Sequence, residues 1–311
     1  MQRVFIDGGE GTTGLRIYER LSALSGIEIF TLDEARRKDP KARQALLHEA
    51  DLAFLCLPDE AARESVSLAQ GSCARIIDAS TAHRTVSGWR YGFPELSFAH
   101  RAGIACGSRV AVPGCHASGF IALAYPLLSA GILSPEAPLS CFSLTGYSGG
   151  GKKMIQEYES ESRDTALDAP RQYATMQTHK HLPEMQQYAG TAFPPVFTPV
   201  VSDFYAGMLV NVPLHRSMLL QQLRPEELTE VYAAHYADSR LISVLPHAAE
   251  NQMLAANALA GKDTMELMVA GNEERMTLLA RYDNLGKGAS GAAIQCMNLM
   301  LGREETDGLM L

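Results

Sequence analysis

Short apolar runs alternate with amphipathic stretches along the first eighty residues. Each run is bounded by glycine, proline or charged residues, which is typical of buried strands. The expected strands are residues 3–7, 27–32, 51–57 and 74–79, and the expected helices are 15–24 and 59–70. Strands that alternate with helices predict an α/β fold with a Rossmann-type, doubly wound parallel sheet. Such a sheet binds ligands beyond the carboxyl ends of its strands.

The pattern changes in the middle of the chain. Further strands are expected at 139–145, 209–213, 241–244, 265–270 and 276–282, and the last two are joined by a turn at 271–274. Strands that follow one another closely, with a short turn between the last two, are typical of an antiparallel sheet. They predict a mixed α+β domain that holds the substrate. Near the end, small residues precede an apolar helix at 292–301, and they would allow it to pack closely on the first domain.

The first strand runs directly into a glycine-rich segment. Glycines there permit a tight turn and a close approach of the backbone, and they aim a helix N-terminus at a pyrophosphate. The strand before and the helix after supply the context that this motif requires. We therefore expect dinucleotide binding by Gly8, Gly9, Gly11, Thr12, Thr13 and Gly14.

The residues after the second strand bear on the choice of cofactor. Asp33 lies 19 residues beyond Gly14, where an acid could accept the ribose 2′-hydroxyl of NAD. Arg36, Arg37 and Lys38 follow at once and suit a 2′-phosphate, which favours NADP. A solvated charged loop is the alternative. Ser80 follows the fourth strand, at the edge where ligands bind, and we expect it to contact the cofactor.

A cysteine follows a Pro-Gly turn and precedes the apolar run 120–128. This pattern predicts that Cys115 stands in the first turn of a helix. Main-chain N–H groups and the helix dipole favour a thiolate there, which is the nucleophilic form. The alternative is a buried cysteine that acts as a small hydrophobic residue.

His179 and His181 stand two positions apart. If their segment is extended, both imidazoles face the same side. We predict no metal site, because no neighbouring cluster of His, Cys, Asp or Glu supplies further ligands. An acid–base role is favoured over a structural one.

The segment 146–153 nearly matches a P-loop, but Lys153 replaces the hydroxyl residue that would hold magnesium. We therefore expect a flexible active-site loop that carries cations, and no ATP or GTP hydrolysis. The candidates for binding an anionic substrate are Arg84, Arg109, Lys152 and Lys153.

Charge and cysteine content narrow the possible partners. The net charge is -8 and there is no basic tract, which argues against nucleic acid as the main partner. No apolar run is long enough to cross a bilayer, so no membrane partner is expected. The cysteines are scattered without a CxxC pair and no signal sequence is recognisable, so we expect reduced thiols in a cytoplasm.

Several motifs in this order resemble the short form of N-acetyl-gamma-glutamyl-phosphate reductase, a family related to aspartate-semialdehyde dehydrogenase. The specific signals are Pro-Gly-Cys at 113–115 and His-Lys-His-Leu-Pro-Glu at 179–184. Other matching segments are 8–14, 54–58, 77–80, 91–96, 146–149 and 282–288.

The resemblance implies NADPH-dependent reduction of N-acetyl-L-glutamyl 5-phosphate to the 5-semialdehyde with release of phosphate, in arginine biosynthesis. It places the nucleophile, and a thioester, on Cys115 and the acid–base role on His179 or His181. It also implies an NADP-binding Rossmann domain, residues 1–114 with 286–311, and a substrate domain, residues 115–285. We expect a homo-oligomer that acts on a small molecule.

One departure from the family pattern matters. The family more often has Pro-Gly-Cys-Tyr-Pro-Thr, whereas this chain has Pro-Gly-Cys-His-Ala-Ser. His116 is therefore an additional titratable group beside the thiol. We favour His181 as the acid–base group, because Pro183 could begin a helix that fixes its ring.

Three other functions compete with this interpretation. The nearest is another acyl-phosphate reductase of the same fold, such as aspartate-semialdehyde dehydrogenase. The second is a non-catalytic NADP-binding sensor in which Cys115 is merely buried. The third is a cysteine hydrolase, against which the glycine loop argues.

Overall fold

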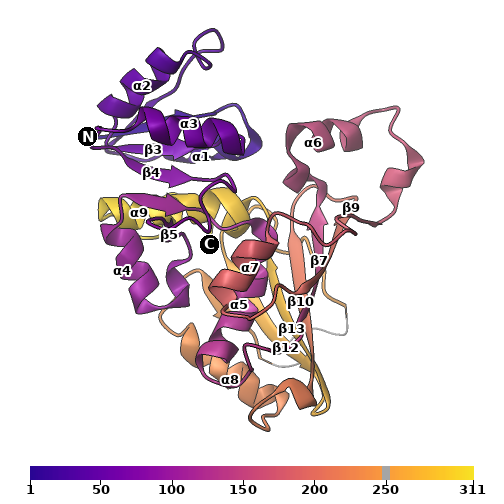
Figure 1. Cartoon of the computed structure of the whole chain (residues 1–311). Coiled ribbons are helices and arrows are strands. Elements are labelled where there is room, and N and C mark those ends of the chain that lie inside the picture. Colours follow the sequence, from indigo (N-terminus) through magenta and orange to yellow (C-terminus); the bar gives the residue numbers. More distant parts are fainter. Residues whose placement is uncertain (247–252) are drawn as a thin grey trace. The chain divides into compact units, whose positions relative to one another are not determined.

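The computed structural model describes residues 1–246 and 253–311, and these form two compact units (Figure 1). Unit 1 consists of residues 1–113 and 289–310. Unit 2 consists of residues 114–288 together with Leu311.

Unit 1 is built on a parallel sheet, as the alternation of strands and helices predicts. Its strand order is β2-β1-β3-β4-β6-β5. The strands are β1 (Gln2–Asp7), β2 (Ile27–Phe30), β3 (Leu52–Leu55), β4 (Arg75–Asp78), β5 (Arg90–Tyr91) and β6 (Arg109–Ala111). The helices are α1 (Thr12–Ser22), α2 (Pro40–Glu49), α3 (Asp59–Leu68), α4 (Phe98–Cys106) and α9 (Gly291–Leu301), with a 3₁₀ turn at Pro94–Leu96.

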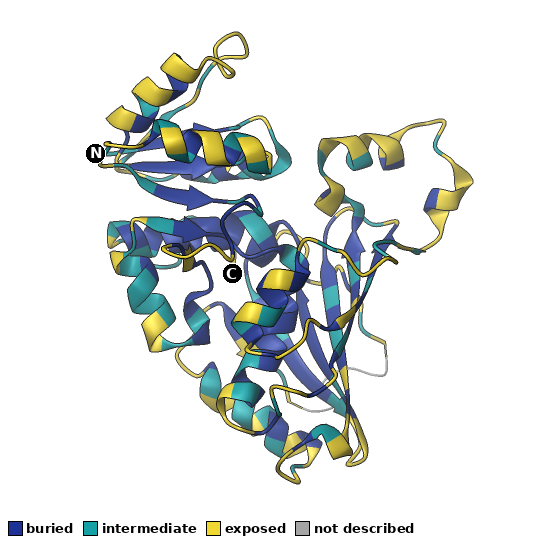
Figure 2. Ribbon diagram, in the orientation of Figure 1, coloured by how far each residue is buried: buried dark blue, intermediate teal, exposed yellow. Residues whose placement is uncertain are grey.

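Helices cover both faces of this sheet because its strands are apolar on both sides. Val4 and Ile6 pack into one core cluster with Ile17 of α1 and residues of α4 and α9. Phe5 points to the opposite face and packs with Leu47 of α2 and residues of α3. Figure 2 shows these strands as buried, with the exposed residues on the outer faces of the helices. The C-terminal helix α9 therefore completes unit 1.

The register of the strands brings distant loops to one edge of the sheet. Asp7 is paired with Leu55, Leu55 with Asp78, and Asp78 with Ala111. Each of these residues ends its strand. The glycine loop and the segments that begin at residues 56, 79 and 112 therefore all leave the sheet at its carboxyl edge.

Unit 2 contains a mixed sheet with the order β11-β12-β13-β10-β7-β9-β8. The strands are β7 (Ser140–Gly146), β8 (Arg171–Gln172), β9 (Val196–Ser202), β10 (Met208–His215), β11 (Ile242–Val244), β12 (Met265–Gly271) and β13 (Arg275–Tyr282). The helices are α5 (Cys115–Ser129), α6 (Gly151–Glu159), α7 (Leu182–Ala189) and α8 (Pro225–His235). Short helical turns occur at Tyr147–Gly150, Thr165–Asp168, Arg216–Met218 and Gly286–Ser290.

Helix α5 is the central helix of unit 2. It packs on β10 and β13, and α7 and α8 pack beside it (Figure 1). Phe120, Leu123 and Leu127 on this helix are completely buried. No helix in the described ranges is long and apolar enough to cross a membrane.

Several predicted boundaries differ from the structure for local reasons. Helix α1 begins at Thr12, three residues before the expected start, because Gly11 is its N-cap. Strand β2 ends at Phe30 instead of residue 32, and a turn follows in which Asp33 accepts main-chain hydrogen bonds from Arg36 and Arg37. The segment 146–153 is not an irregular loop, because it forms a 3₁₀ turn and the first turn of α6.

Candidate functional site

The glycines of the loop after β1 have different roles. Gly8 has φ of +84°, and a Cβ at this position would lie 2.4 Å from the carbonyl oxygen of Cys56. A Cβ at Gly14 would lie 2.6 Å from the carbonyl oxygen of Gly8. At Gly11 the nearest atom to a Cβ would be 3.6 Å away. Gly8 and Gly14 are thus required by the fold, whereas Gly11 leaves space in front of α1.

This space fits the pyrophosphate of a dinucleotide. Gly11 is the N-cap of α1 and has no side chain to bond the first main-chain N–H groups. The Thr12 hydroxyl oxygen is buried and has no hydrogen-bond partner among the described residues. Unused donors at the start of a helix form a binding site for an anion.

Substitutions in this loop should separate cofactor binding from folding. Gly11→Val should leave thermal stability nearly unchanged and severely weaken NADPH binding, because the side chain would fill the space in front of α1. Gly14→Ala should instead destabilise the protein by about 1–3 kcal/mol through overpacking. A titration of NADPH fluorescence and a thermal melt measure the two effects. Unchanged NADPH affinity in Gly11→Val would exclude this loop from the cofactor site.

The basic residues after β2 lie next to the glycine loop. Arg37 pairs with Glu10 of that loop at 2.5 Å and with Glu34 at 3.1 Å. The Asp33 carboxylate accepts a hydrogen bond from the main-chain N–H of Arg36. Asp33 therefore shapes the turn, and this turn places the Arg37 guanidinium beside the glycine loop.

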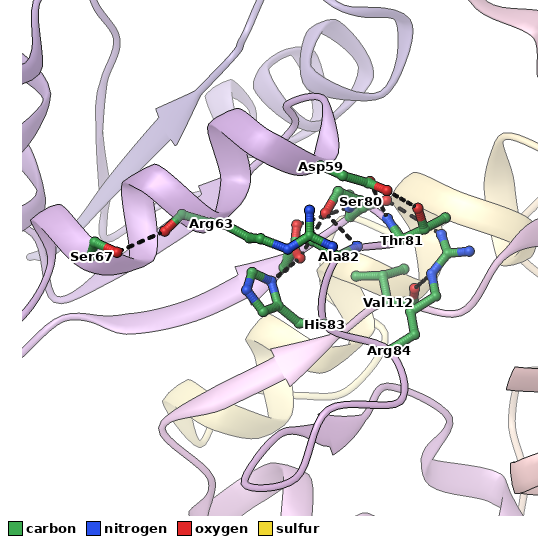
Figure 3. Close-up of polar contacts among 11 residues, drawn as sticks. Asp59, Arg63, Ser67, Ser80, Thr81, Ala82, His83, Arg84 and Val112 are labelled. Carbon is green, nitrogen blue, oxygen red and sulfur yellow. Dashed lines mark hydrogen bonds and ion pairs between the residues drawn. The ribbon is translucent and has the colours of Figure 1, made fainter. Parts of the chain in front are cut away.

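A polar cluster follows β4 at the carboxyl edge of the sheet (Figure 3). The buried Asp78 carboxylate accepts hydrogen bonds from the main-chain N–H and the hydroxyl of Ser80, and lies 2.6 Å from Nδ1 of His83. The His83 ring stacks on Trp89 with 4.2 Å between centroids. The expected cofactor contact Ser80 is therefore held in a rigid turn at the ligand-binding edge.

The predicted anion-binding cations occupy different places. Arg84 is buried, and its guanidinium donates to the carbonyl oxygens of Val112 and Ala79, which follow β6 and β4 (Figure 3). Arg109 lies at the start of β6 with its guanidinium over Trp89. Lys152 is an exposed residue of the first turn of α6 in unit 2. The structure thus does not gather these cations within one unit.

Cys115 is the first residue of α5, as the Pro-Gly-Cys pattern predicts. Gly114 is the N-cap, and its N–H donates to the buried carboxylate of Glu184 on α7 at 3.0 Å. The Tyr282 hydroxyl donates to the Cys115 carbonyl oxygen and accepts from the main-chain N–H of Gly119. These contacts fix the helix start from β13 and from α7, and they leave the thiol half-buried.

Three histidines gather in unit 2. The ring centroids of His179 and His181 are 4.6 Å apart, and both rings lie within 6 Å of the His116 ring. Negative charge on Cys115 contributes to raising the pKa of Tyr173, behind the larger effect of burial. Cys115 directly precedes His116 on α5, and Tyr173 bonds to His116, so the residue that carries the thiol adjoins the histidine cluster.

The geometry of the two later histidines differs from the prediction. Their segment is a turn, since the N–H of Leu182 donates to the carbonyl oxygen of His179. The rings still approach each other, because the N–H of His181 donates to Nδ1 of His179 at 3.1 Å. His181 is the buried N-cap of α7.

His116 does not suit acid–base work at neutral pH. Burial, followed by the charge on His179, lowers the pKa of His116 to about 3. Both of its ring nitrogens have partners, since Nδ1 lies 2.7 Å from the Ser143 hydroxyl and Nε2 lies 2.6 Å from the Tyr173 hydroxyl. Among residues 1–246 and 253–311, no three His, Cys, Asp or Glu side chains are placed to hold a metal.

Sequence reasoning missed several residues that support this site. Glu184 and Tyr282 stand in the motifs that carry the family resemblance, but nothing in the local sequence shows that both reach the start of α5. Tyr173 carries no motif at all. A Cβ at Gly288 would lie 3.0 Å from Cβ of Cys115, and this close approach also arises from tertiary structure.

Comparison with known proteins identifies both parts of the chain. Residues 13–104 match the family model described as semialdehyde dehydrogenase, NAD binding domain, and residues 115–284 match semialdehyde dehydrogenase, dimerisation domain. Unit 1 is thus of a type that binds a nicotinamide dinucleotide, and unit 2 of a type that dimerises.

Solved structures and curated sequences agree with these matches. Aspartate semialdehyde dehydrogenase from Francisella tularensis superposes with a TM-score of 0.75 at 14% identity, over 97% of this chain and 100% of that chain. Aspartate semialdehyde dehydrogenase II from Vibrio cholerae gives a TM-score of 0.74 at 16% identity, over 97% and 99%. These likenesses show a shared fold.

The sequence relatives are much more similar. The chain is 46% identical to N-acetyl-gamma-glutamyl-phosphate reductase of Chelativorans sp. (strain BNC1), over 96% of this chain and 98% of that protein. It is 43% identical to N-acetyl-gamma-glutamyl-phosphate reductase 2 of Nostoc sp. (strain PCC 7120 / SAG 25.82 / UTEX 2576), over 99% of both. The chain therefore belongs to the N-acetyl-gamma-glutamyl-phosphate reductase family.

Proposed function

We propose that this protein reduces N-acetyl-L-glutamyl 5-phosphate to N-acetyl-L-glutamate 5-semialdehyde with NADPH and releases phosphate, a step of arginine biosynthesis. The observation that carries the proposal is the position of Cys115 at the start of α5, directly before His116, whose ring lies against those of His179 and His181. Family membership supplies the substrate class.

Cys115 makes the chemistry possible because an acyl phosphate is a good acyl donor to a thiolate. Sγ of Cys115 attacks the acyl carbon, and the carbon–oxygen bond to phosphate breaks, so that phosphate leaves with the electron pair. A thioester remains on the enzyme. The bound nicotinamide supplies the hydride that reduces it. The resulting thiohemiacetal then loses its thiolate to give the aldehyde.

The histidine turn serves the proton steps. The thiohemiacetal oxygen must gain a proton when it forms and lose it when it collapses, which suits one imidazole acting in both directions. We assign this role to His181, because it is buried at the start of α7 and its main-chain N–H bonds to the His179 ring. His179 then orients His181 and contacts substrate.

The departing phosphate needs a cation. Arg84 is our first candidate, since its guanidinium is held at the carboxyl edge of the sheet in unit 1. Lys152, in the first turn of α6, is a second candidate and would provide an exposed charge. Arg109 has a packing partner in Trp89, so its contribution to phosphate binding is the weakest of the three.

We propose NADPH as the cofactor because Arg36 and Arg37 lie in a turn that Asp33 stabilises, and Arg37 pairs with Glu10 of the glycine loop. Replacing both arginines by alanine should weaken NADPH binding about tenfold or more and leave NADH binding nearly unchanged. The reason is that a hydrogen bond to a charged group contributes about 1.5–3 kcal/mol. The control is Lys41→Ala, an exposed lysine on α2 outside this cluster. Equal losses for both cofactors would contradict the assignment.

The substrate itself is tested against the nearest alternative. Steady-state rates with N-acetylglutamate semialdehyde and with aspartate semialdehyde, each with phosphate and NADP, compare the two reductases directly. Our proposal predicts efficient turnover of the first alone. Preference for the second would make the chain an aspartate-semialdehyde dehydrogenase, and tight NADPH binding without turnover of either would favour a sensor.

We further propose a cytoplasmic homo-oligomer. The six cysteines, all within the described residues, form no disulfide, which suits a reducing compartment. Phe142 of β7 and Val196 of β9 expose apolar side chains on the sheet of unit 2. This agrees with a surface that a second copy covers.

A further inference from the structure

His116 contacts the candidate catalytic turn from a position that the family pattern usually gives to tyrosine. Its imidazole is buried in unit 2 and bridges two hydroxyl groups. Nδ1 lies 2.7 Å from the Ser143 hydroxyl on β7, and Nε2 lies 2.6 Å from the Tyr173 hydroxyl. Either neutral tautomer satisfies both contacts, because a hydroxyl can donate and accept.

The segment that begins at Tyr173 has an unfavourable backbone. Ala174 has φ of 51° and Gln177 has φ of 55°, and these are the described non-glycine residues with positive φ. L-residues adopt this region at a cost, so such a segment persists only where its surroundings hold it. Residues 173–181 run directly from this strain into the histidine turn.

Two attachments hold the segment besides His116. The Gln177 side chain donates to the carbonyl oxygen of Phe197 at 2.7 Å and accepts from its N–H at 2.8 Å. The N–H of Tyr173 donates to the carbonyl oxygen of Pro199 at 3.1 Å. Both attach the segment to β9, whereas the hydrogen bond between the Tyr173 hydroxyl and His116 attaches it to α5.

The surroundings of His116 support a bridging role. The groups that face it are Ser143, Tyr173, His179, His181 and the Phe197 ring, and Cys115 precedes it on its own helix. Burial opposes a charge on His116, and a positive charge on His179 opposes it further. The pKa of His116 is therefore lowered to about 3, and its ring is neutral at neutral pH.

We propose that His116 is a positioning residue: as a hydrogen-bond bridge it fixes Tyr173 and, through Tyr173, the strained segment 173–181 that carries the acid–base group. This inference rests on the proposed acid–base role of the histidine turn. In this role His116 orients that turn relative to α5 and takes no part in proton transfer.

The two ring nitrogens can be tested separately because amide side chains of different length imitate them. An asparagine amide reaches the position of Nδ1, and a glutamine amide reaches that of Nε2. His116→Gln should therefore keep the contact with Tyr173, whereas His116→Asn should lose it, as Tyr173→Phe does. The double variant His116→Asn/Tyr173→Phe completes a double-mutant cycle.

We expect His116→Asn and Tyr173→Phe each to lower kcat roughly tenfold with little change in KM. This loss of kcat is smaller than the roughly hundredfold loss that a 1 Å displacement of a reacting group causes. The double variant should be no worse than either single one, and His116→Gln should recover most of the rate. Thermal melts identify any variant that is unfolded, and Tyr173→Phe keeps the aromatic ring in place.

A second readout does not depend on turnover. Hydrogen exchange of the amides of residues 173–181 should accelerate in His116→Asn and in Tyr173→Phe, but not in His116→Gln. Equal exchange in all variants, additive losses of kcat, or a glutamine variant as slow as the asparagine one would each overturn the inference. If the unmodified protein shows no turnover while hydrogen exchange in the variants changes as predicted, the proposed function is refuted instead.

Discussion

Cys115→Ala should abolish reduction of the acyl phosphate and leave NADPH binding intact. The reason is that no other group can form the thioester, whereas the glycine loop belongs to unit 1 and keeps its structure. Cys115→Ser should retain little activity, because an alkoxide forms much less readily than a thiolate. Absorbance of the nicotinamide measures the reaction, and NADPH fluorescence measures binding.

A second thiol provides the matched control for this substitution. Cys106 is an exposed cysteine at the end of α4, and Cys106→Ala should behave like the unmodified protein.

Alkylation by iodoacetamide, followed by peptide mapping, tests whether Cys115 is present as the reactive thiolate. Burial raises the pKa of Cys56 to about 12, so Cys56 should resist the reagent. Activity of Cys115→Ala near that of the unmodified enzyme would eliminate the covalent mechanism.

His181→Asn should have the second largest effect and lower turnover by about a hundredfold or more, the scale of losing a general acid–base group. It should also raise the pH at which iodoacetamide alkylates Cys115, because the thiolate would lose a cationic partner. The buried position of His181 at the start of α7 favours His181 over the more accessible His179 as the acid–base group. Turnover and alkylation profiles against pH measure both effects.

The neighbours of His181 give the comparison that decides the assignment. Lys180→Ala changes an exposed charge in the same turn and should leave turnover nearly unchanged. His179→Asn should lower turnover less than His181→Asn, since it removes the partner of the His181 N–H. If His179→Asn is the more damaging change, the two roles are exchanged. If His116→Asn alone shifts the alkylation profile, the assignment to the turn fails.

The first unit could be predicted from sequence because its signals are local. A strand, a glycine turn and a helix follow one another within the first 22 residues, and the structure has β1 and α1 there. Strand β5 was not predicted, since it is only two residues long and takes its shape from pairing. Helix α2 was missed because its surface is largely polar.

The candidate site was predictable only in part. Pro113 and Gly114 before an apolar run correctly placed Cys115 at a helix start. The spacing of His179 and His181 would put both rings on one side of an extended segment, but the segment is a turn, and Gln177 and Tyr173 before it contact β9 and α5. Those contacts join residues far apart in sequence, so no local pattern encodes them.

The reverse reaction tests the central claim most directly. N-acetylglutamate semialdehyde and NADP are mixed with the enzyme, and absorbance at the nicotinamide band is followed while the phosphate concentration is varied. If the oxidised substrate is held as a thioester on Cys115, the formation of NADPH beyond one turnover requires phosphate, saturates with it, and is absent in Cys115→Ala. Sustained NADPH formation at an equal rate without phosphate, or in Cys115→Ala, would contradict the account.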